Sequence, residues 1–322
     1  MSTLLFWSCR WARKREAALY LKEVVREQDV CFIGLLEIKM TCIGRKEIDY
    51  LIGNDWEFFH IPAVGLSGGM LVLWDKRILS FVVKGTSSQM ILGDLLIRCM
   101  GLWKIAMVYG SRCCKEREDL WRQLEDGWKE PNPSIIGGDF NCILNKEEKR
   151  GGKRFVFFKG PREMKQFMTN SDFHDLRSVG PKYTWCNNKE GTSQIWERLD
   201  RCLVNSIALQ RILAAMTRHL ARVASDHSPI AIKLDEKIQV KRNSIKFEDT
   251  WRSYPAARSI VYHFWKKNDF GDHSEILQRK NYITMKALFF WSKNKCKNLK
   301  TLKEDLKKDI IKLQNKEVDG VG

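Results

Sequence analysis

The chain has 322 residues, of which 44% are hydrophobic and 12 are tryptophan, so its composition excludes a disordered protein. No apolar run approaches the length of a membrane span, and we expect no membrane association. The formal net charge of +17 favours a polyanionic partner such as nucleic acid, although a solvated lysine-rich surface would carry the same charge. The 10 cysteines lack the spacings of a disulfide framework or a zinc site, which indicates an intracellular protein.

The first two thirds of the chain combine many short strands with a few helices. Residues 4–8 have the pattern of a strand, residues 14–26 that of an amphipathic helix, and residues 29–39 that of a buried strand ending in Glu37. Further strands are expected at 56–62, 68–75, 79–85, 94–100, 103–110, 134–140, 182–187, 195–204 and 228–234, and helices at 116–128 and 160–170. Many buried strands with few helices predict two packed sheets with helices outside them.

The last third has a different composition, and we place a domain boundary between residues 236 and 237. Residues 1–236 form the first predicted domain, and residues 237–322 form a basic helical connector with 20 Lys and Arg against 10 Asp and Glu. Residues 247–255 read as a loop with aromatic anchors, and helix is expected beyond. Apolar residues spaced by three or four predict a seam on a long lysine-rich helix: Leu299, Leu302, Leu306, Ile310 and Leu313. This segment either adds sequence-independent affinity for DNA or is a solvated face around a coiled-coil seam.

The stretch PSIIGGDFNCIL, residues 133–144, places polar groups directly after a buried strand. Residues two apart in an extended chain point the same way, so Asp139 and Asn141 would face one point while Phe140 anchors the other side. An anion beside an amide donor suits a water nucleophile next to a phosphate. The two glycines could instead simply end the strand and leave ordinary turn residues.

Other predicted strands end in polar groups of the same kind: Glu37, Tyr109, Asp200 and the pair Asp226-His227. Each is weak evidence alone, because an acid at a strand end is usually solvated. Together they match the needs of phosphodiester hydrolysis. Glu37 is a hard oxygen ligand for Mg²⁺, and His227 held by Asp200 would stabilise charge or move a proton. Tyr109 adds a phenol donor to developing negative charge.

A set of motifs within residues 4–234 resembles the endonuclease/exonuclease/phosphatase superfamily, and most closely the endonuclease domain of plant-type non-LTR (LINE-like) retrotransposon polyproteins. The motifs, in chain order, are VYG, GGDFNCIL, EKRGG, YTWCNN, ERLDRCLVN and SDHSPI. The resemblance implies an α+β, four-layer α/β/β/α sandwich of the DNase I-like kind, followed here by a mainly helical C-terminal extension. It also implies Mg²⁺-dependent nicking of DNA, with Mn²⁺ as a substitute cation, that leaves a 3′-hydroxyl to prime reverse transcription in the nucleus.

The resemblance carries roles onto individual residues of this chain. It implies Glu37 and Asp226 on the metal side, Tyr109 and Asn141 on the phosphate, and Asp139 on the water. It further implies Asp200 as the partner that orients His227, and His227 at the transition state. Thr184 and Arg198, together with Asn141, fall where nucleic acid would be contacted. No reverse transcriptase sequence follows in the chain, so we expect a fragment with a connector.

One departure from the family pattern concerns the first strand. Relatives carry Trp-Asn-Cys-Arg-Gly, whose Asn supports the metal site, and this chain has Trp7-Ser8-Cys9-Arg10-Trp11. Ser8 is shorter and offers no carbonyl oxygen, and Trp11 replaces a glycine in a tight turn. We therefore expect weakened Mg²⁺ binding with Ser8 at the metal site. Two other hypotheses stay open: an inactive remnant that only binds nucleic acid, and another phosphoesterase of the superfamily.

Overall fold

The computed structural model describes residues 2–9, 15–63, 68–98, 100–128, 131–212, 215–234 and 247–320. The predicted turn at Trp11 lies outside these residues, as does the side chain of the seam residue Leu299. The chain divides into two compact units, one of residues 1–238 with 313–322 and one of residues 239–312, and each is described by itself.

The first unit contains two large sheets and one small one. The strands are β1 Thr3–Ser8, β2 Val30–Leu36, β3 Trp56–Ile61, β4 Met70–Asp75, β5 Leu79–Thr86, β6 Met90–Ile97, β7 Gly101–Tyr109, β8 Ser134–Asp139, β9 Lys149–Arg150, β10 Phe173–Asp175, β11 Ser178–Val179, β12 Trp185–Cys186, β13 Trp196–Glu197, β14 Asp200–Asn205, β15 Thr217–His219 and β16 Ile230–Lys233. The seven-stranded sheet has the order β11-β15-β16-β1-β2-β4-β3, and the six-stranded sheet has the order β10-β14-β8-β7-β6-β5. The small sheet has the order β12-β13-β9.

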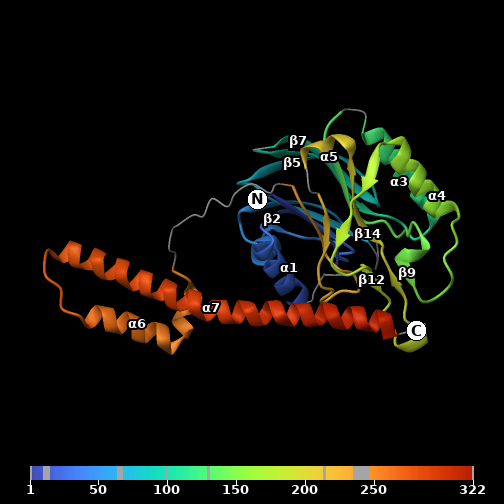
Figure 1. Ribbon diagram of the computed structural model, residues 1–322. Helices are drawn as coiled ribbons and strands as arrows, with labels where there is room; N and C mark the ends of the chain where they lie inside the picture. The colour runs from blue at the N-terminus through green and yellow to red at the C-terminus, as the bar shows by residue number, and fades with distance from the viewer. Residues whose placement is uncertain are drawn as a thin grey trace. The chain divides into compact units, whose positions relative to one another are not determined.

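Helices cover the outer face of each large sheet, so the unit has four layers (Figure 1). Helices α1 (Arg15–Glu27) and α2 (Arg45–Leu51) pack their apolar faces on the seven-stranded sheet. Helices α3 (Cys114–Gly127) and α4 (Lys159–Asn170) do the same on the six-stranded sheet. Side chains from both sheets fill the space between them. The predicted four-layer α/β/β/α sandwich is therefore confirmed.

Some elements differ from those expected from the pattern of apolar residues. The run 195–204 is not one strand: β13 pairs in the small sheet and β14 pairs with β8. Hydrogen bonds to distant segments separate the two strands: the N–H of Arg198 donates to the carbonyl of Glu148 at 2.9 Å, and the carbonyl of Leu199 accepts from the N–H of Phe140 at 3.0 Å. The short elements α2, α5 (Ser206–Arg211), β9, β10, β11 and β15 were not expected.

The pair Gly137-Gly138 lies in the middle of the sandwich, within β8, and does not end the strand. A Cβ atom on Gly137 would lie 2.2 Å from the ring of Phe6 on β1. Gly138 has φ +140, and a Cβ there would lie 2.1 Å from the carbonyl oxygen of Val108. The first glycine thus lets the two sheets approach each other, and the second permits a backbone conformation that other residues avoid.

The second unit is helical, with a short 3₁₀ turn at Asp249–Ser253 followed by α6 (Pro255–Lys266) and α7 (His273–Gly320). Trp251 is buried against Ala257 and Leu288, and its indole N–H donates to Ser292. The expected loop with an aromatic anchor is thus a 3₁₀ turn, and the expected helices are present. The described seam residues Leu302, Leu306, Ile310 and Leu313 are exposed. In the part of the chain that the structure describes, no helix is both long enough and apolar enough to cross a membrane.

We expect Gly137→Ala to destabilise the fold by about 1–3 kcal/mol, because the added methyl group would overpack the contact with Phe6. Urea denaturation measures the loss. Gly85→Ala is the matched control, since a Cβ on that strand glycine would lie 4.0 Å from Leu92, in ordinary contact. Equal stabilities of the two variants would contradict the close approach of the sheets.

Candidate active site

Three neighbouring strands of the six-stranded sheet bring polar side chains to one level. Tyr109 at the end of β7 is in register with Asp139 at the end of β8. Asp139 is in turn paired with Asp200 at the start of β14. Ile135 and Gly137 face the space between the sheets, so alternation along β8 turns Asp139 toward the same space. The strand register thus brings these three residues together, as the sequence predicted.

His227 reaches this point from the other sheet, where it precedes β16. Its Nδ1 lies 2.9 Å from Oδ2 of Asp200, and its Nε2 lies 3.7 Å from Oδ2 of Asp139. All three side chains are buried. The indole N–H of Trp7 donates to the backbone carbonyl of His227 at 3.1 Å and ties this residue to β1. The predicted Asp200–His227 pair is present in the structure.

The buried charges change the proton affinity of this group. Burial raises the pKa of Asp139 to about 7; His227 opposes the rise and Asp200 adds to it. Burial alone would lower the pKa of His227, but the charges of Asp200 and Asp139 outweigh it and raise that pKa to about 9. At neutral pH the imidazole is therefore protonated, and Asp139 titrates close to neutrality.

Glu37 follows β2 with φ 54, a left-handed conformation that is uncommon for a residue with a side chain. The hydroxyl of Tyr109 donates a short hydrogen bond to its carboxylate. Burial, and then this hydrogen bond, raise the pKa of Tyr109 well above its usual range, so the phenol keeps its proton. The structure thus brings Glu37 and Tyr109 together across the two sheets.

Asn141 also has a left-handed backbone, with φ 46, and this turn is held by Asp139. The backbone N–H of Asn141 donates to Oδ1 of Asp139 at 2.8 Å. The side-chain amide donates to the carbonyl of Gly110 at 2.8 Å and, over a longer 3.3 Å, to Oδ2 of Asp139. The amide is therefore beside Asp139 as predicted, but a left-handed turn after the strand, and not alternation along an extended chain, places it there.

Asp226 and Ser8 lie at the seven-stranded side of the site. Oδ2 of Asp226 accepts from the indole N–H of Trp185 at 3.1 Å. The hydroxyl of Ser225 donates to the backbone carbonyl of Ser8 at 2.8 Å. The Ser8 hydroxyl itself is buried and has no hydrogen-bond partner among the described residues. A buried polar atom without a protein partner usually forms its hydrogen bond with a ligand, an ion or a water molecule.

The carboxylate oxygens at the site suit a hard divalent cation. Asp139, Asp200 and His227 each offer one atom, and these atoms lie within 4.8 Å of one another. This group, found in the described part of the chain, differs from the predicted set of Glu37, Asp226 and Ser8. Carboxylate oxygens are the ligands that Mg²⁺ prefers, and the unpaired hydroxyl of Ser8 adds a further oxygen.

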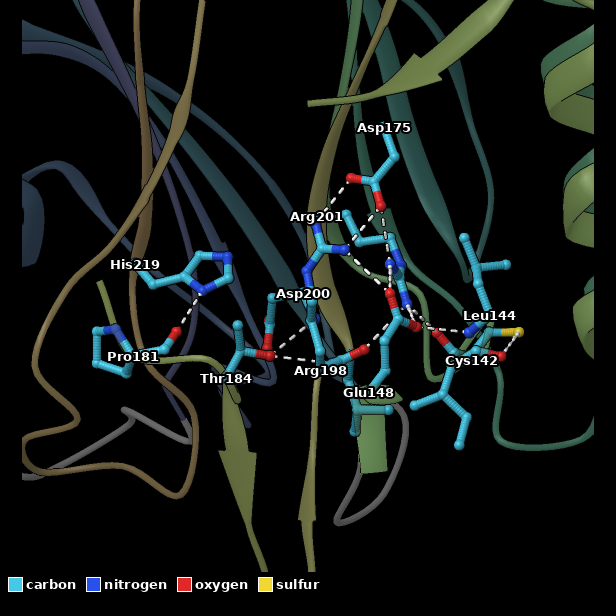
Figure 2. Close-up of polar contacts among 12 residues, drawn as sticks. Cys142, Leu144, Glu148, Asp175, Pro181, Thr184, Arg198, Asp200, Arg201 and His219 are labelled. Atoms are coloured by element: carbon cyan, nitrogen blue, oxygen red, sulfur yellow. Dashed lines mark hydrogen bonds and ion pairs between the residues drawn. The ribbon is translucent and has the colours of Figure 1, made fainter. Parts of the chain in front are cut away.

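Thr184 and Arg198 have structural partners in the fold. Thr184 is fully buried, and its hydroxyl accepts from the N–H groups of Leu199 and Asp200, each at 3.0 Å. Arg198 forms ion pairs with Asp175 and Glu148, as Figure 2 shows. Both residues thus position β14, and contact of either with nucleic acid stays a prediction.

A buried charge network beside the site was not recognised from the sequence. Arg201 is completely buried on β14 and forms ion pairs with Glu148 at 2.6 Å and Asp175 at 2.9 Å (Figure 2). It also donates to the carbonyl of Cys142 at 3.0 Å. Burial alone would raise the pKa of Glu148, but Arg201 outweighs it and the pKa is lowered. The network holds the turn after Asn141 against β14. The charges of Glu148 and Arg201 in the sequence could have indicated it.

This arrangement of sheets and helices is the DNase I-like fold that was predicted. The chain is similar to the endonuclease domain of TRAS1, a telomere-specific non-LTR retrotransposon, with a TM-score of 0.53 and 15% identity over 74% of this chain and 100% of that chain. It is also similar to the AP endonuclease LMAP from Leishmania major, with a TM-score of 0.58 and 12% identity over 72% of this chain and 86% of that one.

A third similar structure is an AP endonuclease from Archaeoglobus fulgidus, with a TM-score of 0.56 and 13% identity over 73% of this chain and 100% of that one. No protein-family model matches the chain, and neither does any curated protein. At these identities the comparisons establish the fold, and the chemistry must be argued from the site itself.

We expect Arg201→Met to cost about 3–5 kcal/mol of unfolding free energy, because Glu148 and Asp175 would lose the fully buried one of their two cations and keep only Arg198. Arg45→Met is the matched control: its ion pair with Asp49 is exposed and should contribute about 0–1 kcal/mol. Urea unfolding compares the two variants. A loss no larger for Arg201 than for Arg45 would show that the buried network does not hold the site.

Proposed function

We propose that this protein is a Mg²⁺-dependent endonuclease that nicks DNA and leaves a 3′-hydroxyl, as in the target-primed integration of retrotransposons. The observation that carries the proposal is the buried group of Asp139, His227 and Asp200, joined by distances of 2.9 and 3.7 Å at the ends of two sheets. The net charge of +17 supports a polyanionic substrate over a small phosphate ester.

Asp139 is the group that accepts a proton from the attacking water. A general base works best when its pKa lies near the working pH, and that of Asp139 is raised to about 7. The amide of Asn141, two residues further on, lies next to this carboxylate and can turn its longer hydrogen bond toward a phosphate oxygen. Water and phosphate would thus be held at one point by neighbouring residues.

His227 provides positive charge where the transition state becomes negative. Its pKa is raised to about 9, so it is an imidazolium at neutral pH, and Asp200 fixes the ring through Nδ1. The Nε2–H, which lies 3.7 Å from Oδ2 of Asp139, can then donate to the phosphate oxygens or to the leaving group. Tyr109 keeps its proton and orients the carboxylate of Glu37.

Glu37 and Asp226 would hold the cation, with the unpaired hydroxyl of Ser8 as an additional oxygen. We assign the cation to this set because Asp200 and His227 already bond to each other and a protonated imidazole is not a metal ligand. A bound Mg²⁺ would supply positive charge to the phosphate and its leaving oxygen. Mn²⁺, which accepts the same ligands, is expected to substitute.

Nicking of supercoiled plasmid with Mg²⁺, and its loss with EDTA, is the direct test of this function. We expect Asp139→Asn and His227→Gln each to lower the nicking rate by about 10²- to 10⁴-fold, because the first removes the proton acceptor and the second removes the positive charge beside the phosphate. Asp119→Asn, an exposed acid on α3, is the control and should nick at the wild-type rate.

Wild-type rates in both site variants would place the chemistry elsewhere. A folded wild-type protein that binds DNA but never nicks it would instead support the remnant that only binds nucleic acid. End-labelling of the nick with a polymerase shows whether a 3′-hydroxyl is produced.

Ser8→Asn should lower the Mg²⁺ concentration for half-maximal nicking by about 10- to 100-fold, because an amide reaches further and offers a carbonyl oxygen. Ser80→Asn, on an exposed position of β5, should leave it unchanged. Thermal unfolding verifies that the larger side chain is accepted at the buried position. An unchanged Mg²⁺ dependence in a folded Ser8→Asn protein would show that this position does not serve the metal.

A further inference from the structure

Residues 153–158, here called the aromatic loop, connect β9 to α4 with the sequence Lys-Arg-Phe-Val-Phe-Phe. Three consecutive apolar side chains in it are exposed: Val156 by 70%, Phe157 by 52% and Phe158 by 75%. A soluble fold gains nothing from presenting two phenylalanines and a valine to water, so such a run indicates a surface that binds something.

Both ends of the aromatic loop are anchored to the fold. Gly151 and Gly152 precede it with φ values of +76 and +65, and Cβ atoms there would lie 2.1 Å from the carbonyl oxygen of Gln194 and 2.7 Å from Ile195. At the other end, Lys159 forms an ion pair with Glu118 on α3. The exposed rings are therefore carried by a backbone that is fixed on both sides.

Residues 153–156 of the aromatic loop line a cavity of about 280 Å³ that also reaches Asn141. Asn141 lines it at the site end, and Arg117, Lys149, Lys153 and Arg154 line it elsewhere. No acidic residue lines it in the described part of the chain. The cavity therefore carries positive charge and is continuous with the residue that we place at the cleaved phosphate.

Two of these cations are free to meet an anion. Lys149 is paired with Glu197, and Arg117 donates to the carbonyl oxygens of Ser111 and Asn141. Lys153 and Arg154 are exposed and have no ion-pair partner among the described residues. Their charge therefore favours a polyanion next to Asn141.

A cation already lies over one of the exposed rings. Nζ of Lys165 on α4 is 4.9 Å from the ring centroid of Phe157. Aromatic rings beside free lysines and arginines are the combination with which proteins bind single-stranded nucleic acid, since every base has a face that can stack and every nucleotide has a phosphate. In a paired duplex these base faces are hidden by their neighbours.

We propose that the aromatic loop holds unpaired nucleotides next to the cleaved phosphate, with Lys153 and Arg154 on the backbone phosphates and Phe157 and Phe158 stacked on bases. The inference rests on the proposed nuclease function and adds the form of the substrate: DNA that is opened beside the nick site. A protein partner would not explain why the apolar run is joined to a basic cavity that ends at Asn141.

Binding of fluorescent DNA to the full chain, measured by anisotropy in EDTA so that nothing is cleaved, tests the proposal. The probes are a duplex and the same duplex with an unpaired bubble. We expect the wild type to prefer the bubble, and Phe157→Ala/Phe158→Ala to weaken bubble binding by about 5- to 100-fold with little effect on the duplex. Phe157→Leu/Phe158→Leu should also lose the preference, because leucine is apolar but cannot stack.

Val82→Ala/Leu96→Ala is the matched control, since these residues of β5 and β6 are exposed by 53% and 51%. It should bind both probes as the wild type does. Equal affinity of wild type and alanine variant for the bubble, or full rescue by leucine, would overturn the proposal and favour a protein-binding surface. If the loop-dependent preference is found but the wild type nicks neither probe with Mg²⁺, the nuclease function fails and the binding site remains.

Discussion

Two buried carboxylates, those of Asp139 and Asp200, lie side by side at the end of the sandwich, and the other residues of the site surround them. Asp139 and Asp200 are paired in register on adjacent strands and are almost completely shielded from water. Like charges in such a place repel strongly unless a cation or a proton intervenes. His227 supplies that charge from the other sheet, so this contact also links the two sheets at this end.

The strand β14 links this group to a second network of buried charge. Asp200 and Arg201 are neighbours in the chain, so their side chains point to opposite faces of the sheet. Asp200 bonds to His227 between the sheets, whereas Arg201 pairs with Glu148 and Asp175 on the outer side. A buried ion pair contributes little net stability compared with apolar residues, but breaking one is costly, so such networks fix geometry. The network thus fixes the position of Asp200 from the outer face of the sheet.

Backbone strain also occurs at the site. Glu37 and Asn141 both have left-handed backbones directly after a strand, with φ values of 54 and 46. Each such residue costs about 1–2 kcal/mol, and local hydrogen bonds compensate for the cost. Tyr109 donates to the side chain of Glu37, and the carboxylate of Asp139 accepts from the backbone of Asn141. Alternation along β2 would otherwise have placed Glu37 on the outer face with Leu35, away from the site.

The sequence by itself predicted the class of fold and placed Asp139, Asn141, Asp200 and His227 at strand ends, because apolar alternation marks the strands and motif spacing marks their ends. It also indicated the helical second unit from the steps of its apolar residues. Only the tertiary structure decided that Thr184 and Arg198 are held inside the fold, that Arg201 organises a buried network, and that residues 195–204 divide between two sheets. The physical reason is that these outcomes depend on hydrogen bonds and ion pairs between segments far apart in the chain, which a local pattern of residues does not contain.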